Sequence, residues 1–115
     1  MRLYTVADGI DLDFGGSAAG TAIDTSTLGL PFQPGNTVVA CLAIESWAEA
    51  ALAAVGMELQ GSENETTGFE TLLAAGGLAN APVVMAEIQL PQYIRWAMTS
   101  ATAGDGRGSI NLLSN

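Results

Sequence analysis

One short run, residues 37–44 (TVVACLAI), restricts the fold more than any other part of this sequence. Successive side chains of a β-strand point to opposite faces. Here both faces are apolar, with Val39, Cys41 and Ala43 on one and Val38, Leu42 and Ile44 on the other. Such a run predicts either a central strand of a sandwich or a strand that a partner chain covers.

Further β-like runs follow, and turn-forming residues separate them. Residues 81–91 (APVVMAEIQLP) form an apolar run bounded by prolines, and residues 93–102 (YIRWAMTSAT) alternate between two faces. The segment 104–108 (GDGRG) predicts a turn before a last short strand over residues 109–113. Several short strands with turn-rich connections predict an all-β fold, an antiparallel β-sandwich.

The length of 115 residues predicts a single domain. Within it we expect an extended N-terminal arm over residues 1–36 and a β-sandwich core over residues 37–115. The arm opens with a strand-like run, contains a candidate strand near residues 22–25, and otherwise has turn formers without a sustained period. Because a stretch this long without structure is uncommon inside a compact domain, we expect the arm to lie along a neighbouring subunit.

The segment 46–56 (SWAEAALAAVG) supports two structures equally well. Ser46 followed by Glu49 matches a helix capping box, and Gly56 fits a helix C-cap. The alternation of Ala53, Val55 and the apolar residues after them instead predicts a strand. The pattern alone leaves both readings open.

The charge balance excludes some partners. Twelve acidic residues accompany three arginines, with no lysine and no histidine, for a formal charge of −9. Binding to nucleic acid or to an anionic membrane needs cations, so we expect neither. Only 13% of residues are charged, against about 25% in typical domains, while 49% are hydrophobic. We infer that partner chains cover part of the apolar surface, although an alanine- and glycine-rich monomer would have the same composition.

The sequence contains little material for catalysis. Without histidine or lysine, the commonest general base and Schiff-base chemistry are absent. Cys41 lies in an apolar run, where a thiol is usually an inert small hydrophobe. Asp8, Asp11 and Asp13 could offer oxygens to calcium, but their spacing is not that of an EF-hand loop, and a solvated acidic loop is the simpler reading. We expect a protein that is not an enzyme, with no catalytic residue, cofactor or metal.

Residues 56–72 (GMELQGSENETTGFETL) predict a β-hairpin. Gly61 and Gly68 frame a stretch of Ser, Asn, Glu and Thr, which favour turns. The acidic tip with Glu63 and Glu65 is therefore read as a turn rather than as a cation site. The apolar residues beside it are candidates to face the core: Met57, Leu59, Phe69 and Leu72.

Two stretches, LQGSENETTGFETL at 59–72 and LPQYIRWAMTSATAGDGRGSINL at 90–112, carry a resemblance to a family. They resemble small jelly-roll capsid cement (decoration) proteins of tailed bacteriophages. The resemblance implies a jelly-roll β-sandwich with a strand over residues 52–60. It also implies a homotrimer bound to the major capsid protein on the outer surface of the virion, made in the bacterial host cytoplasm. Similar hairpins occur in viral tail and fibre domains, so a receptor- or carbohydrate-binding module is the alternative.

Four residues are candidate interface positions. Arg95 lies within an apolar strand, where a guanidinium needs an acidic or carbonyl partner to offset desolvation. Trp47 falls in a predicted loop, where an exposed aromatic often marks a contact. Leu30 and Phe32 are the candidates on the N-terminal arm. We place the second tryptophan, Trp96, in the core.

Overall fold

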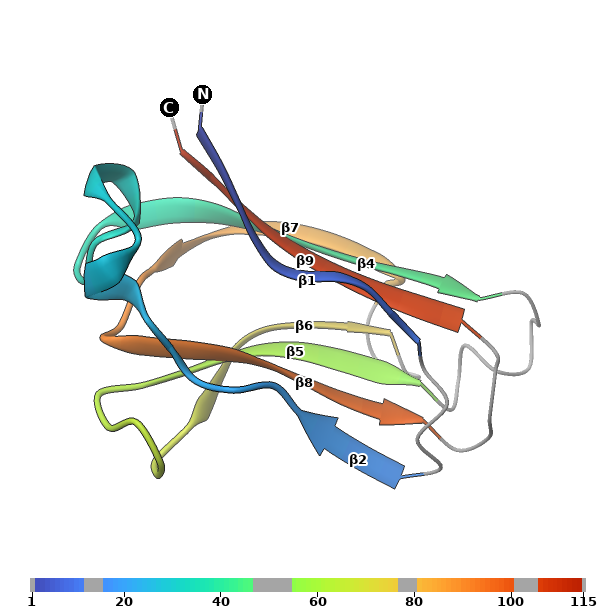
Figure 1. Ribbon diagram of the computed structural model, residues 1–115. Coiled ribbons are helices and arrows are strands. Elements are labelled where there is room, and N and C mark those ends of the chain that lie inside the picture. The colour runs from blue at the N-terminus through green and yellow to red at the C-terminus, as the bar shows by residue number, and fades with distance from the viewer. Residues whose placement is uncertain (1, 12–15, 47–54, 77–80, 101–105, 115) are drawn as a thin grey trace.

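The computed structural model describes residues 2–11, 16–46, 55–76, 81–100 and 106–114, and these fold into two antiparallel sheets packed face to face (Figure 1). The four-stranded sheet has the order β1 (Arg2–Asp11), β9 (Gly106–Ser114), β4 (Thr37–Ser46) and β7 (Val83–Gln89). The five-stranded sheet has the order β2 (Gly16–Ala19), β8 (Tyr93–Ser100), β5 (Gly56–Ser62) and β6 (Glu70–Gly76), with β3 (Ile23–Asp24) also paired to β8. The predicted all-β antiparallel sandwich is confirmed.

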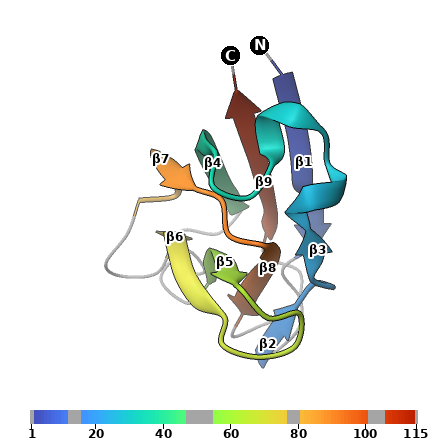
Figure 2. The same ribbon diagram turned by 90° about the vertical axis from the view of Figure 1, so that its left-hand side faces the viewer.

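The order of the strands is that of a jelly roll. The short strands β2 and β3 both pair with β8, so they act as one interrupted strand. Counted in this way, the described part of the chain has eight strands, which alternate between the two sheets except where β5 and β6 form a hairpin within one sheet. Figure 2 shows the two layers from one end. This double-sheet arrangement is the one that jelly rolls use to protect most of their sheet edges.

The strands of the N-terminal segment belong to the sandwich of their own chain. β1 pairs with β9 from Arg2 opposite Ser114 to Asp11 opposite Arg107, with two irregularities in the register. The strand predicted near residues 22–25 is β3, which pairs with β8. The segment is extended, as expected, but its described strands hydrogen-bond to β8 and β9 rather than leaving the molecule to reach a neighbour.

The core lies between the sheets and follows the predicted alternation. In β4, Val38, Leu42 and Ile44 are buried, so this face of the two-faced run is the inner one, a choice that the sequence left open. Other side chains from both sheets are almost fully buried beside them: Met57, Leu59, Ile94, Met98, Ile110 and Leu112. Burying one such side chain contributes about 1.5–3 kcal/mol. The core therefore stabilises a sandwich without any disulfide.

The prediction of a turn over residues 104–108 is wrong for the second half of that segment. Arg107 and Gly108 lie inside β9, and residues 104 and 105 are outside the described chain. A side chain at position 108 would meet the sulfur atoms of Met57 and Met98 across the core. Glycine here permits close packing between the sheets rather than a turn, which is one of the two meanings of glycine in a strand.

Two 3₁₀ turns, Thr25–Thr27 and Leu30–Phe32, connect β3 to β4. Thr25 is fully buried and ties this connection to the start of β8. Its hydroxyl donates to the carbonyl oxygens of Pro91 and Gln92 at 2.7 and 3.0 Å, and its backbone N–H also donates to Gln92 at 2.9 Å. The contact joins positions more than sixty residues apart, so it stabilises the fold as a whole.

Replacing Thr25 with valine keeps the shape of the side chain but removes the hydroxyl donor of the Pro91 carbonyl, while the Gln92 carbonyl keeps only its bond from the Thr25 N–H. We expect Thr25→Val to lower the free energy of unfolding by about 1–3 kcal/mol, measured by urea denaturation. Thr37→Val is the matched control, since Thr37 is exposed and its hydroxyl makes no hydrogen bond with a described residue; it should change stability by less than about 0.5 kcal/mol. Equal effects of the two substitutions would contradict the role of the Thr25 hydroxyl.

Asp24 caps the first 3₁₀ turn, and its carboxylate gathers several donors. The Ser26 hydroxyl donates to Asp24 Oδ1 at 2.6 Å and is the largest cause of a lowered pKa of Asp24. Partial burial acts in the opposite direction, while the Ser26 N–H and the side-chain amide of Gln92 lower the pKa further. The ionised form is therefore the one that the folded state favours.

A carboxyl group whose pKa is lowered by folding stabilises the protein above its unfolded pKa, about 3.9 for aspartate, and loses this effect in acid. Asp24→Asn keeps an oxygen that can cap the turn but removes the charge. We expect wild type to be more stable than Asp24→Asn at neutral pH, and the difference to shrink as the pH falls below about 4. Urea denaturation across this range measures it; parallel pH dependence of the two proteins would contradict the assignment.

Candidate functional site

The outer face of the four-stranded sheet is apolar over much of its area. The strand register places Leu3 of β1 beside Leu113 of β9, and Leu113 beside Val39 of β4. The neighbouring rows add further apolar residues, so that we define the outer apolar face by seven side chains: Leu3, Val39, Cys41, Ala43, Val83, Met85 and Leu113. Polar side chains interrupt the same rows, with Glu87 opposite Val39, Asn111 opposite Cys41 and Ser109 opposite Ala43. Leu3, Val83 and Met85 are 61%, 57% and 61% exposed. Adjacent apolar side chains of this kind mark interaction surfaces.

The second apolar face of the run 37–44 explains this surface. The inner residues of β4 fill the core, while Val39, Cys41 and Ala43 remain half-buried on the outside. β4 is thus a central strand, which is one of the two predicted possibilities, and its outer side is also apolar, with no described element packed on it. The sequence pattern indicated this face; the flanking residues Leu3, Met85 and Leu113 became part of it only through strand pairing.

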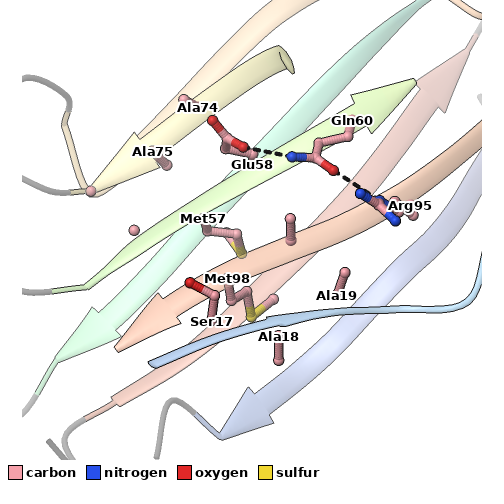
Figure 3. A pocket seen from close by; sticks show the side chains of 13 residues that line it. Ser17, Ala18, Ala19, Met57, Glu58, Gln60, Ala74, Ala75, Arg95 and Met98 are labelled. Carbon is pink, nitrogen blue, oxygen red and sulfur yellow. Dashed lines mark hydrogen bonds between the residues drawn. The ribbon is translucent and has the colours of Figure 1, made fainter. Parts of the chain in front are cut away.

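The outer face of the five-stranded sheet contains an open hollow of about 540 Å³ (Figure 3). Its floor is a row of four residues, one from each of four neighbouring strands: Ala19, Ala97, Glu58 and Ala74. Three of the four are alanines, and Glu58 is the only charged residue in this row. Gln60 and Arg95 line the hollow in the next row and are direct neighbours on β5 and β8. Polar groups therefore stand at one side of a shallow alanine-lined surface.

Hydrogen bonds connect these polar side chains in one continuous series. Arg95 Nε donates to Gln60 Oε1 at 2.8 Å, and Gln60 Nε2 donates to Glu58 Oε2, also at 2.8 Å. The Thr71 hydroxyl donates to the second carboxylate oxygen of Glu58 at 2.8 Å. The Arg95 guanidinium also lies over the ring of Phe69, 4.0 Å from its centroid. Each charged group is thus held in place by neutral partners.

Arg95 has a carbonyl partner, as the sequence analysis required, but the partner belongs to a side-chain amide. Among the residues that the structure describes, the ion pair within 4.0 Å is instead Arg107 with Asp11, at 3.3 Å on the surface. Phe69, expected in the core, is half-buried beneath Arg95. Sequence reasoning missed Gln60 as a residue of the hollow; its alternation with Glu58 on one face of β5 was the available signal.

The two candidates from the N-terminal segment differ in exposure. Leu30 is 85% exposed at the tip of the second 3₁₀ turn. Its backbone carbonyl accepts a hydrogen bond from the Asn36 side chain at 2.9 Å, which helps to hold the loop. Phe32 is only 4% exposed and packs against Tyr4, with ring centroids 6.0 Å apart. Leu30 is therefore available for contact, whereas Phe32 is a core residue with little surface to offer a partner.

The two tryptophans lie in different parts of the chain. Trp96 is partly buried and packs against the core, as predicted. Its indole lies so close to Gly20 that any side chain at position 20 would collide with it. Trp47 and residues 48–54 are outside the described chain. The choice between helix and strand for residues 46–56 is therefore answered only at the end of that segment, where β5 begins at Gly56.

The acidic hairpin tip is a self-supporting turn. The hairpin of β5 and β6 is confirmed, and Glu63 and Glu65 are exposed between its strands. The Ser62 hydroxyl donates to the Thr67 carbonyl at 2.6 Å and accepts from the Asn64 N–H at 2.9 Å. Gly68 adopts a positive φ of 75°, a conformation that favours glycine. Internal hydrogen bonds and glycine geometry account for the shape of the loop.

The described residues form no group of three or more His, Cys, Asp or Glu side chains placed to hold a metal ion. Asp11 lies beside Arg107, and Asp13 of the candidate calcium segment is outside the described chain. The described part of the chain also has no helix with the length and apolar character needed to cross a membrane. Comparison of the chain with protein-family models and with curated proteins gives no match.

The contact between Arg95 and Phe69 can be tested by a double-mutant cycle. Phe69→Leu keeps an apolar side chain but removes the ring that attracts the guanidinium. We expect a coupling energy of about 0.5–1 kcal/mol between Phe69→Leu and Arg95→Met, measured by urea denaturation of the wild type, both single variants and the double variant. Additive effects would contradict an energetic contribution of this contact.

Proposed function

We propose that this protein is a capsid decoration protein, a structural component of a virion that binds the outer surface of the major capsid protein shell and stabilises it. The observation that carries the proposal is the outer apolar face of the four-stranded sheet. Leu3, Val83 and Met85 are each more than half exposed on it, in a chain of high apolar content. Apolar surface of this kind is stable in water when a permanent partner covers it.

Two further features support a structural role. The jelly-roll order of the strands recurs in viral capsid and lectin domains, although a fold alone does not define a function. Leu30 is a second exposed apolar residue, and it lies in the second 3₁₀ turn rather than in a strand of the outer apolar face. A homotrimer would present three copies of each surface to the shell, and multivalent attachment would strengthen weak individual contacts.

The alternative function, a receptor- or carbohydrate-binding module, has less support from the described residues. Glycan binding of the kind considered for this chain needs an exposed aromatic platform. None of the aromatic residues that the structure describes is fully exposed: Phe32 is buried, and Tyr4, Phe69, Tyr93 and Trp96 are partly buried. We therefore favour the decoration function.

A charge on the outer apolar face should separate binding from folding. We expect Met85→Glu to fold with nearly unchanged stability, because Met85 is 61% exposed. Its affinity for purified shells of the cognate major capsid protein should fall at least about tenfold, equivalent to about 1.4 kcal/mol, because the interface would bury an unpaired carboxylate. Co-sedimentation with shells measures the affinity, and analytical ultracentrifugation tests the trimer.

The control for this experiment is Thr67→Glu, which adds the same charge at the exposed tip of the hairpin in the other sheet. It should bind shells like wild type. If Met85→Glu binds as well as Thr67→Glu, the outer apolar face is not the surface that meets the shell. If wild type itself does not bind, the proposed function is wrong.

A further inference from the structure

The hollow on the five-stranded sheet contains one fixed cation and one fixed anion that do not neutralise each other. Glu58 and Arg95 both line it, and the side chain of Gln60 lies between them, accepting from Arg95 and donating to Glu58 (Figure 3). In a chain with twelve acidic residues and three arginines, an arginine held by an amide rather than by a carboxylate is notable. The arrangement keeps two opposite charges apart and aligned.

The guanidinium of Arg95 still has N–H donors that can bind a ligand. Within the described part of the chain, its guanidinium donates one side-chain hydrogen bond, from Nε to Gln60. The planar group is also fixed against Phe69. A guanidinium has four further N–H donors on its terminal nitrogens, in a geometry that suits a carboxylate. Because the side chain is already held in place, less conformational entropy is lost when a ligand binds.

Glu58 is also held in place and can still accept further hydrogen bonds. Gln60 and Thr71 each donate to one of its carboxylate oxygens, and no arginine of the described chain lies within 4.0 Å of it. An ionised carboxylate can accept about four hydrogen bonds. The group is therefore oriented and still able to accept a bond from a cation.

The two charges lie within reach of an extended peptide. Glu58 and Gln60 are alternate residues of β5, and Arg95 is opposite Gln60 on β8, so Glu58 and Arg95 are diagonal neighbours about 7–8 Å apart. Side chains i and i+2 of an extended peptide project from one side about 6.7 Å apart, which is close to this spacing. Ala97 and Ala74 flank Glu58 on the neighbouring strands, and their short side chains leave room for a peptide backbone above the sheet.

The geometry points to a binding site for an extended segment of a partner protein, which presents an acidic side chain to Arg95 and, two residues away, a basic side chain to Glu58. Charge complementarity selects this ligand, since a purely acidic segment would meet Glu58 and a purely basic one would meet Arg95. The site lies on the sheet opposite to the outer apolar face, so it is independent of the proposed binding to a capsid shell.

The test uses the intact chain and a blocked tripeptide, acetyl-Lys-Ala-Asp-amide, with affinity measured from ¹H–¹⁵N NMR titration. We expect saturable shifts at residues of β5 and β8 around the hollow. Acetyl-Lys-Ala-Asn-amide and acetyl-Met-Ala-Asp-amide each lack one charge and should bind roughly fivefold more weakly, as expected for loss of one partly exposed ion pair. These peptide changes leave the protein untouched, so a folding defect cannot cause the result.

Protein variants then assign each charge to its partner. Arg95→Gln should abolish the preference for Asp over Asn in the peptide, and Glu58→Gln should abolish the preference for Lys over Met, with thermal unfolding as the check that both fold. Thr67→Glu, away from the hollow, should keep both preferences. No saturable binding, or binding that ignores either charge, would overturn the proposal. Equally strong binding of free lysine and aspartate would also overturn it, by showing a small-molecule site instead.

Discussion

The apolar character of both faces of β4 is the constraint on which the rest of the structure depends. Its inner residues, including Leu42, join the core between the sheets, which fixes β4 as a central strand between β9 and β7. The same pleat turns Val39 and Cys41 outwards, where strand pairing places Leu113 beside Val39 and Met85 beside Cys41. A monomer cannot bury both faces of one sheet in a two-layer sandwich. The surplus apolar surface is therefore a consequence of the sequence, and it leads directly to the proposal of a permanent partner.

The two sheets present different chemistry to the outside. The four-stranded sheet offers apolar side chains such as Met85, whereas the five-stranded sheet offers a hydrogen-bonded chain from Thr71 to Arg95 beside small residues. An apolar face suits a stable contact, because burying it releases water without requiring exact polar geometry. A surface with fixed opposite charges suits selection among partners, because a wrong arrangement of charges is penalised. Under the two proposals, one small domain would have separate surfaces for attachment and for recognition.

Much of the fold was predictable because it depends on local alternation and turn chemistry. The hairpin of β5 and β6, with its polar tip at residues 62–68, could be predicted from residues that are close in sequence. The errors arose where distant elements decide a residue's role. Gly108 looked like part of a turn, but it is required by Met57 and Met98 across the core. Phe69 looked like a core residue, but Arg95 of β8 covers its ring instead.

The candidate sites show the same division. The sequence by itself determined the β-strand period, the two apolar faces of β4, the net charge of −9 and the exclusion of histidine- and lysine-dependent chemistry, because these follow from residue identity and from the alternation of side chains. Only the tertiary structure decided that Leu3 and Leu113 join the same surface, that Gln60 separates Arg95 from Glu58, and that Phe32 is buried while Leu30 is exposed. These outcomes depend on the register between strands that are far apart in the chain, and a shift of one residue would have turned each side chain to the opposite face.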